Sequence, residues 1–155
     1  MDLSQLKGRN VLVLGGTGAM GVYVVPELAK HGCKVCVVSL DERVSDDPLV
    51  TYVKGNALDD QYLAGLMRQK FDAVIDFMLY GTEQFRARHE IFLNNTGHYI
   101  FLSSYRVYSG GVPVTENTPR LLDVSPDKEF LQTEDYSLYK ARQENILQAS
   151  KFTNW

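Results

Sequence analysis

The sequence predicts an α/β fold in which a doubly wound parallel sheet is covered by helices on both faces. Two observations support this prediction. Short, almost continuously apolar segments alternate with segments whose apolar residues recur at helical spacing, which is typical of parallel strands joined by crossover helices. In addition, a glycine-rich stretch stands directly between the first apolar segment and the first helical one, where a tight strand-to-helix turn is required.

Five strands and four helices are expected in turn. The expected strands are Asn10–Leu14, Lys34–Leu40, Leu49–Val53, Ala73–Met78 and His98–Leu102. The expected helices are Ala19–His31, Asp59–Lys70 with Asp59 as N-cap, about Glu83–Asn95, and Glu134–Ser150. A polar loop with glycine and proline runs from Ser109 to Thr133. The strand order that follows is 3-2-1-4-5, with a ligand site at the switch point beside the first strand.

Composition narrows the class of protein. The chain has 155 residues, of which 45% are hydrophobic and 23% charged, as in one ordinary globular domain. A net charge of −3 argues against nucleic acid as a partner. No apolar run approaches the roughly 18 residues that a membrane span needs, and the N-terminus lacks a signal sequence, so we expect a cytoplasmic protein.

Two cysteines, Cys33 and Cys36, have C-x-x-C spacing. They stand in an apolar segment that is expected to be a strand, and residues three apart on a strand point to opposite faces. We therefore expect two buried thiols rather than a redox pair or half of a metal site.

The glycine-rich stretch has the spacing G-x-x-G-x-x-G at Gly15, Gly18 and Gly21. Gly15 permits the tight turn, Gly18 lets the backbone approach a pyrophosphate, and Gly21 removes a side chain where helix meets strand. The N-terminus of the following helix offers free N–H groups to phosphates. This context predicts a dinucleotide site, whose backbone contacts would come from Gly15, Thr17, Gly18, Ala19, Met20 and Gly21.

The end of the second strand leaves the choice of dinucleotide open. An acidic residue there holds the ribose hydroxyl of NAD, and Asp41 lies just beyond that end. Arg43 follows and, with Ser39, could form a pocket for the 2′-phosphate of NADP. Both cofactors are retained, with NADP favoured.

The last helix carries Tyr136 and Lys140 at i, i+4, on one face. An ammonium beside a phenol favours phenolate, so such a tyrosine can exchange a proton with a substrate alcohol or carbonyl while a hydride is transferred. Ser103 and Ser104 end the fifth strand, at the same sheet edge as the glycine loop. A hydroxyl there could bind the reacting oxygen.

With these motifs, and with Phe101–Tyr108 reading F-L-S-S-Y-R-V-Y, the chain resembles the extended short-chain dehydrogenase/reductase family, the NAD-dependent epimerases and dehydratases. The resemblance implies a Rossmann-type fold and the catalytic residues Ser104, Tyr136 and Lys140, of which Tyr136 and Lys140 also contact the cofactor. It implies further that Asn56 and Ala57 flank the adenine and that Phe77 and Met78 lie under the cofactor.

Three departures from the family pattern matter. Leu14 replaces a usual threonine, Ser39 replaces the usual acid, and the stretch from Phe77 to Ser104 is short. The last two resemble an atypical branch of NAD(P)-binding regulators. A non-catalytic sensor is therefore the alternative to an NAD(P)-dependent epimerase, dehydratase or reductase acting on a sugar-nucleotide-like substrate. We favour the enzyme because Ser104, Tyr136 and Lys140 are all present.

The last residues, Lys151–Trp155, read like a chain entering another buried strand, and Asn154-Trp155 resembles the start of the family's sixth strand. We therefore expect residues 1–155 to be a cofactor-binding domain, with the substrate domain absent and the small-molecule substrate bound only by the complete protein. We expect a homo-oligomer, formed either through the apolar edge left beside the fifth strand or through the helices at Glu83–Asn95 and Glu134–Ser150, which the resemblance implies as the dimer face.

Overall fold

The computed structural model describes residues 3–155, which divide into two compact units. The first, here called the sheet unit, contains the chain up to Leu79 together with Glu90–Leu102 and Asn154–Trp155. The second, the helical unit, contains Tyr80–His89 and Ser103–Thr153. Each unit is described by itself.

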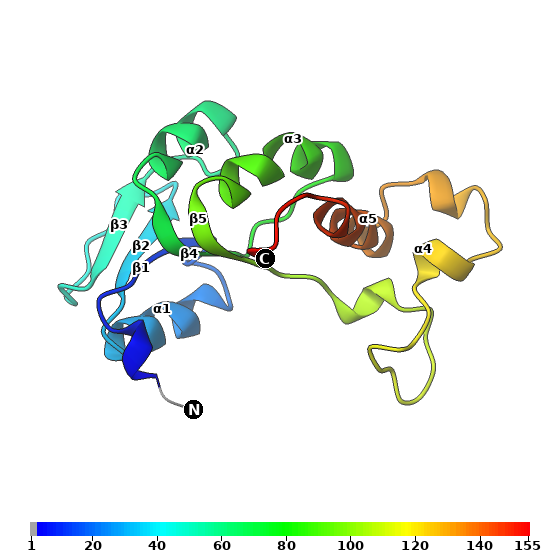
Figure 1. Ribbon diagram of the computed structural model, residues 1–155, viewed down its shortest axis with the longest axis horizontal. Helices are drawn as coiled ribbons and strands as arrows, with labels where there is room; N and C mark the ends of the chain where they lie inside the picture. The colour runs from blue at the N-terminus through cyan, green and yellow to red at the C-terminus, as the bar shows by residue number, and fades with distance from the viewer. Residues whose placement is uncertain (1–2) are drawn as a thin grey trace. The chain divides into compact units, whose positions relative to one another are not determined.

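The sheet unit contains a parallel sheet with the predicted strand order, β3-β2-β1-β4-β5 (Figure 1). The central strand β1 pairs in parallel with β2 on one side and β4 on the other, and β3 and β5 form the edges. This confirms the predicted fold class. The strands are β1 (Asn10–Leu14), β2 (Lys34–Ser39), β3 (Val50–Lys54), β4 (Phe71–Asp76) and β5 (Thr96–Phe101).

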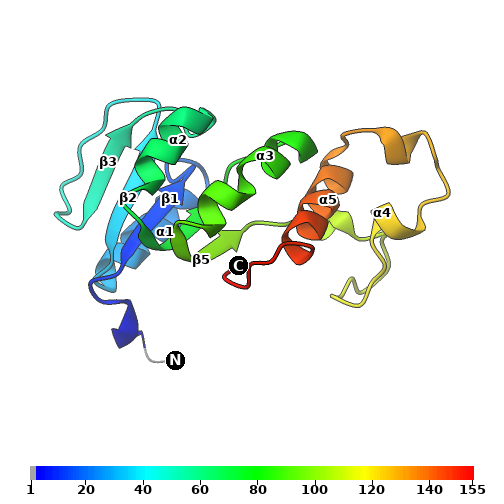
Figure 2. The ribbon, with the colours of Figure 1, turned by 45° about the horizontal axis from the view of Figure 1, so that its top comes forward.

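Helices cover both faces of this sheet. Helix α1 (Gly21–Lys30) lies on one face and α2 (Asp60–Met67) on the other (Figure 2). Under α1, Val25 and Ala29 pack on Val11, Val13 and neighbouring strand residues in one buried cluster. The near-continuous apolar sequence of β1 follows from this arrangement, because a strand covered on both faces buries successive side chains.

The predicted helix starts are explained by local hydrogen bonds. The Asp59 carboxylate caps α2, accepting hydrogen bonds from the N–H groups of Gln61 (2.9 Å) and Tyr62 (3.0 Å), as expected. Helix α3 (Thr82–Leu93) runs from the helical unit into the sheet unit, where Phe92 stacks on Tyr99 of β5 with ring centroids 4.8 Å apart.

Several predicted strand ends were too long. Strand β2 ends at Ser39, not Leu40, and β5 ends at Phe101, so Ser103 and Ser104 lie beyond it. Strand β4 ends at Asp76, because the Asp76 carboxylate accepts the N–H of Met78 (3.0 Å) and turns the chain out of the ladder. Phe77 and Met78 therefore follow the strand rather than belong to it.

The predicted loop from Ser109 to Thr133 is partly helical. It contains the short helix α4 (Leu121–Val124) and a 3₁₀ helix at Phe130–Gln132. The Arg120 guanidinium, just before α4, holds the carboxylate of Asp123. Such a short turn, stabilised by one local ion pair, has too few residues for a helical pattern to show. Helix α5 (Tyr136–Gln148) follows and begins two residues later than predicted.

The expected strand at the end of the chain is wrong in detail. Residues 151–155 have no regular structure, and Trp155 is 41% exposed. The Asn154 carbonyl nevertheless accepts the N–H of Tyr99 (2.7 Å), and its side-chain amide donates to the carbonyls of Leu93 (3.0 Å) and Thr96 (2.8 Å). Asn154 thus lies beside β5, where the resemblance placed it, without forming a strand.

The two cysteines are free thiols. Cys33 is buried just before β2 and Cys36 is half-buried within it, so the prediction of burial holds fully only for Cys33. Burial raises the pKa of both thiols. Within residues 3–155, each helix is too short or too polar to cross a membrane.

Candidate functional site

The glycine loop leaves the carboxyl end of β1 and enters α1 through one tight turn. Gly15 has φ +73°, a conformation that a residue with a side chain adopts only with strain. The N–H of Gly18 donates to the Gly15 carbonyl (3.0 Å), and the Gly18 carbonyl accepts the N–H of Val22 (3.1 Å). The role predicted for Gly15, a tight turn, is therefore confirmed.

Gly21 is required by a close approach, although not the predicted one. A Cβ built on Gly21 would overlap the backbone of Gly16, within the loop itself, rather than a strand. Gly16 in turn packs on the sheet, since a Cβ there would lie 2.7 Å from Cγ1 of Val37. The loop and the first turn of α1 thus pack backbone against backbone.

Gly18 differs from these glycines because few protein atoms lie where its side chain would be. Gly18 is exposed, and an added Cβ would meet only the Gly15 carbonyl oxygen, at 3.2 Å. Ala19 and Met20 are exposed as well, and among the described residues no side chain caps α1 at Met20. The first turn of α1 contains no acidic residue. A ligand could therefore approach the main chain at Gly18 without meeting a protein side chain or an acidic group.

The segment after β4 borders the glycine loop. A Cβ on Gly15 would lie 3.2 Å from Cβ of Phe77 and 3.5 Å from Sδ of Met78. Beneath them Asp76 is buried, and its carboxylate accepts the Tyr99 hydroxyl (2.8 Å). The structure therefore brings Gly15, Phe77 and Met78 together at the switch point between β1 and β4.

The residues expected at the ribose occupy different environments. Ser39 is buried, and its hydroxyl accepts the N–H of Asp41 (3.2 Å) while its carbonyl accepts the N–H of Gly55 (2.8 Å). Asp41 and Arg43 are exposed in the loop that joins β2 to β3. Because Ser39 already supports this loop, Asp41 and Arg43 are the side chains that are accessible to a ligand.

The segment expected beside the adenine lies after β3. The side-chain carbonyl of Asn56 accepts the N–H of Leu58 (2.9 Å), and Ala57 is 6% exposed. Parallel strands end at the same edge of the sheet, so Asn56, Ser39 and Gly15 follow three neighbouring strands at that edge.

The remaining predicted site residues belong to the helical unit. Tyr136 is the first residue of α5, and Asp135 caps this helix by accepting the N–H (2.9 Å) and hydroxyl (2.6 Å) of Ser137. These hydrogen bonds hold the pKa of Asp135 below its ordinary value. Tyr136 is half-buried, whereas Lys140 is 1% exposed.

Tyr139 packs on Tyr136. The two rings meet edge to face, with centroids 5.3 Å apart. Burial, with a smaller contribution from neighbouring Tyr136, raises the pKa of Tyr139. The Tyr139 ring therefore packs directly beside the Tyr136 ring at the start of α5.

Ser103 and Ser104 have separate partners. The Ser104 hydroxyl accepts the N–H of Arg106 (3.2 Å) and caps the 3₁₀ helix Tyr105–Val107. The Ser103 hydroxyl donates to the carboxylate of Glu144, which also binds Arg120 at 3.0 Å. The half-buried Ser104 hydroxyl still has a proton to donate, so Ser104 matches its expected role better than Ser103.

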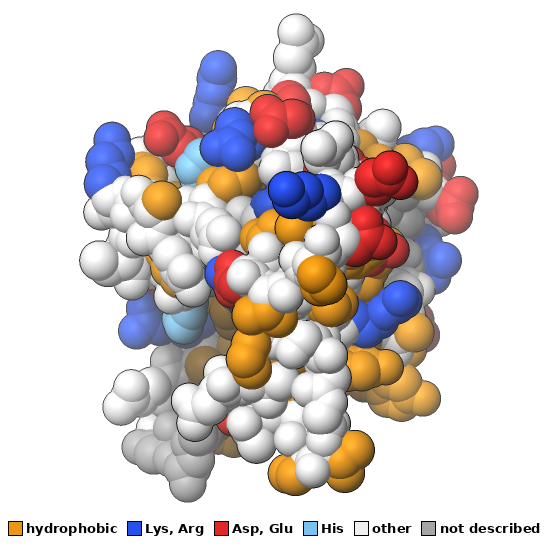
Figure 3. Space-filling view, turned by 90° about the vertical axis from the view of Figure 1, so that its right-hand side faces the viewer, with side chains coloured by type: hydrophobic (Ala, Val, Ile, Leu, Met, Phe, Trp, Pro, Cys, Tyr) orange, Lys and Arg blue, Asp and Glu red, His pale blue; other side chains and the backbone are white. Residues whose placement is uncertain are grey.

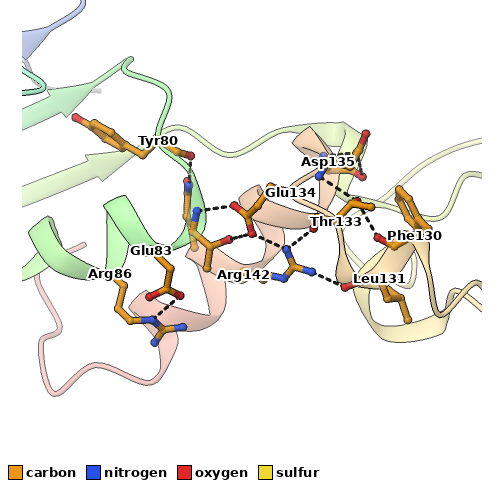
Figure 4. A network of polar contacts seen from close by, with 12 residues as sticks. Tyr80, Glu83, Arg86, Phe130, Leu131, Thr133, Glu134, Asp135 and Arg142 are labelled. Atoms are coloured by element: carbon orange, nitrogen blue, oxygen red, sulfur yellow. Dashed lines mark hydrogen bonds and ion pairs between the residues drawn. The ribbon is translucent and has the colours of Figure 1, made fainter.

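A second polar network fixes the start of α5 (Figure 4). The Glu134 carboxylate accepts the N–H and hydroxyl of Thr82, both at 2.8 Å, and so supports the first residue of α3. Arg142 binds Glu134 (2.8 Å) and the carbonyls of Thr133 (2.7 Å) and Leu131 (2.6 Å). Burial opposes ionisation of Glu134, but these partners outweigh it and lower its pKa.

Sequence reasoning missed Glu134, Glu144 and Arg106. Glu144 had a signal, because it stands four residues after Lys140, on the face that carries Tyr136. The partners of Glu134 and Glu144 lie 52 and 41 residues away, at Thr82 and Ser103, and left no signal in the spacing.

Three comparisons place the chain among known proteins. The model of the NAD dependent epimerase/dehydratase family matches residues 11–153. A UDP-glucose 4-epimerase of Lactobacillus helveticus is 28% identical over 88% of this chain and 46% of its own length. The chain thus spans about half the length of the curated relative it matches.

Solved structures agree on the fold. The UDP-Glc/GlcNAc 4-epimerase of Campylobacter jejuni has a TM-score of 0.70 at 20% identity, over 91% of this chain and 48% of that one. The Bordetella bronchiseptica enzyme WbmG, in complex with NAD and UDP, has a TM-score of 0.71 at 14% identity, over 94% and 51%. At these identities the likeness concerns the fold alone.

Proposed function

We propose, because the chain belongs to the NAD dependent epimerase/dehydratase family, that it forms the dinucleotide-binding part of an enzyme acting on a sugar-nucleotide-like substrate. The observation that carries this proposal is the loop at Gly18, where an added Cβ would meet only one carbonyl oxygen of the protein. The resemblance to a UDP-glucose 4-epimerase supports the substrate class, and membership of an NAD dependent family supports an NAD-type cofactor.

The chemistry assigned to the helical unit is proton transfer. When bound, the nicotinamide cofactor supplies an acceptor or donor of hydride. The Tyr136 phenolate takes up the proton of the reacting substrate hydroxyl, the Tyr136 phenol returns a proton in the reverse direction, and the Ser104 hydroxyl donates a hydrogen bond to the same substrate oxygen. Lys140, which is buried on the same helix, favours the phenolate during this exchange.

The choice between NAD and NADP is assigned to Arg43, with NADP favoured. Arg43 is exposed beyond the end of β2, and a guanidinium there can pair with a 2′-phosphate. Replacing Arg43 by alanine should weaken NADP binding by about 1.5–3 kcal/mol and leave NAD binding unchanged. Equal losses for both cofactors would instead assign the ribose to Asp41.

Cofactor binding by a Gly18→Ala variant tests the proposed function. The added methyl group meets only one carbonyl oxygen of the protein but occupies the surface assigned to the pyrophosphate. Calorimetry should show binding of NAD(H) or NADP(H) by the wild type and a loss of about tenfold or more in the variant, that is about 1.4 kcal/mol.

The matched control is Gly65→Ala in α2, where an added Cβ meets nothing within 4 Å. This variant should bind cofactor as the wild type does. The proposal is wrong if the folded wild type binds neither dinucleotide, or if Gly18→Ala binds as tightly as Gly65→Ala.

A further inference from the structure

Arg106 contacts both Ser104 and Tyr136, the two residues assigned to the reacting substrate oxygen. Its backbone N–H donates to the Ser104 hydroxyl (3.2 Å), and its guanidinium lies 5.6 Å from the centroid of the Tyr136 ring. A guanidinium within about 6 Å of an aromatic ring centroid is attracted to the ring. The 3₁₀ helix Tyr105–Val107 thus presents a cation beside the phenol.

The guanidinium keeps its hydrogen-bonding capacity. Among the described residues, Arg106 contacts the Tyr136 ring and makes no hydrogen bond or ion pair through its guanidinium. Arg120 and Arg142, in the same unit, are both bound to carboxylates, and their side chains are 20% and 21% exposed. Arg106 is exposed, so its N–H groups face solvent beside Tyr136.

The carboxylate that interacts with the Arg106 charge belongs to Asp135, and it already accepts hydrogen bonds from another residue. Asp135 accepts two hydrogen bonds from Ser137, and the nearby charge of Arg106 adds to the lowering of the Asp135 pKa. Asp135 therefore stays ionised as the cap of α5, while Arg106 has room for a second anion.

The position of Arg106 sets the class of substrate. The Tyr136 hydroxyl is assigned to the reacting oxygen, and the Arg106 guanidinium lies 5.6 Å from the centroid of the same ring, within reach of a charged group on a sugar bound there. The planar fork of N–H groups in arginine suits carboxylate and phosphate oxygens. We propose that Arg106 binds a carboxylate or phosphate group that the sugar carries close to its reacting hydroxyl, and so selects acidic sugars. This inference rests on the proposed role of Tyr136.

Matched pairs of sugars test this inference on the complete enzyme, which is the form expected to bind substrate. The ¹⁵N NMR signals of the arginine Nε–H groups are recorded while glucuronate, glucose 6-phosphate or glucose is added, with and without NAD⁺, and UDP-glucuronate is compared with UDP-glucose. The Arg106 signal is identified by its loss in Arg106→Lys. At least one acidic sugar should bind about tenfold more tightly than its neutral counterpart and shift this signal. Glucuronate reports on carboxylate, and glucose 6-phosphate on phosphate.

Variants give the deciding comparison. Arg106→Gln should reduce the preference for the acidic sugar to less than about threefold, and Arg106→Lys should retain part of it. The control Arg68→Gln removes an exposed arginine next to α2 and should behave as the wild type. The inference is overturned if no acidic sugar binds more tightly than its neutral counterpart, or if Arg106→Gln keeps the preference. The sugars are also added without NAD⁺. A failure of cofactor binding, which would contradict the proposed function, is therefore distinguished from a failure of Arg106 to bind the acidic sugar.

Discussion

The carboxylate of Glu144 accepts a hydrogen bond from the Ser103 hydroxyl, which connects α5 to the segment that follows β5. The same carboxylate binds Arg120, and the two side chains are 21% and 20% exposed. Glu144→Gln keeps the shape of the side chain but removes the ion pair with Arg120.

We expect this variant to lower the free energy of unfolding by about 1–2 kcal/mol, because a partly desolvated charged hydrogen bond is lost. Urea denaturation measures the change. The matched control is Glu83→Gln, which breaks an ion pair with Arg86 whose side chains are 82% and 57% exposed. This control should change stability by less than about 0.5 kcal/mol. Equal effects of the two substitutions would show that the Glu144 contacts stabilise nothing beyond a surface pair.

Tyr136→Phe should abolish turnover in the complete enzyme and leave cofactor affinity nearly unchanged, since only the hydroxyl is needed for proton transfer. A loss of about 10²–10⁴-fold in kcat is expected. Steady-state kinetics with a sugar nucleotide, together with cofactor titration, measure both quantities. Tyr139→Phe is the control, because Tyr139 contributes its ring edge to Tyr136. Turnover retained in Tyr136→Phe would remove this residue from the mechanism.

Gly21→Ala should destabilise the fold, because the new Cβ would overlap the Gly16 backbone and neither chain segment can yield without disturbing the sheet. We expect a loss of about 2 kcal/mol or more in the free energy of unfolding, in the range of overpacked cores. The same change at Gly65, in the open middle of α2, should stabilise the protein by about 0.5–1 kcal/mol. Thermal and urea unfolding would contradict this explanation if the two variants changed stability in the same direction.

Asp72 should make stability depend on acid pH. The Asn10 N–H (2.7 Å) and the Arg9 guanidinium (2.9 Å) donate to its carboxylate and hold the pKa of Asp72 below the ordinary 3.8. Because the folded-state pKa is the lower one, the stabilisation is present above the ordinary value and is lost as pH falls through the folded value.

Asp72→Asn should therefore be less stable than the wild type at neutral pH, and the difference should shrink as the solution is acidified below the ordinary value. Urea denaturation across this range measures it. A difference that stays constant with pH would mean that the ionisation of Asp72 is not involved.

The strand order could be predicted because it depends on local patterns. Apolar runs such as Asn10–Leu14 predict buried parallel strands, and Gly15, Gly18 and Gly21 between a strand and a helix predict the turn. Asp59, as an N-cap, acts within three residues of itself, so its role was also visible. These interactions are encoded over a few neighbouring positions.

The features of the site and of the strand ends that could not be predicted depend on contacts between distant parts of the chain. The role inferred for Arg106 depends on its contact with Tyr136, which is remote in sequence. The role of Glu134 depends in the same way on its hydrogen bond with Thr82. The predicted ends of β4 and β5 were too long because apolar character continues past Asp76 and Phe101, whereas the strands end there. Periodicity records which side chains are apolar, but not where a ladder of backbone hydrogen bonds stops.

The backbone contact between Gly16 and Gly21 changes what the glycine pattern can reveal about ancestry. The protein's own structure requires three of these glycines. Gly15 has a left-handed conformation, Gly16 packs closely on Val37, and Gly21 packs on the backbone of Gly16. Selection for folding alone would preserve these three glycines in a descendant that no longer used a dinucleotide. Gly18 carries no comparable internal requirement, so it would be free to drift once the ligand was gone. In a lineage of such chains, loss of glycine at position 18 alone would therefore mark the branch on which cofactor use ended.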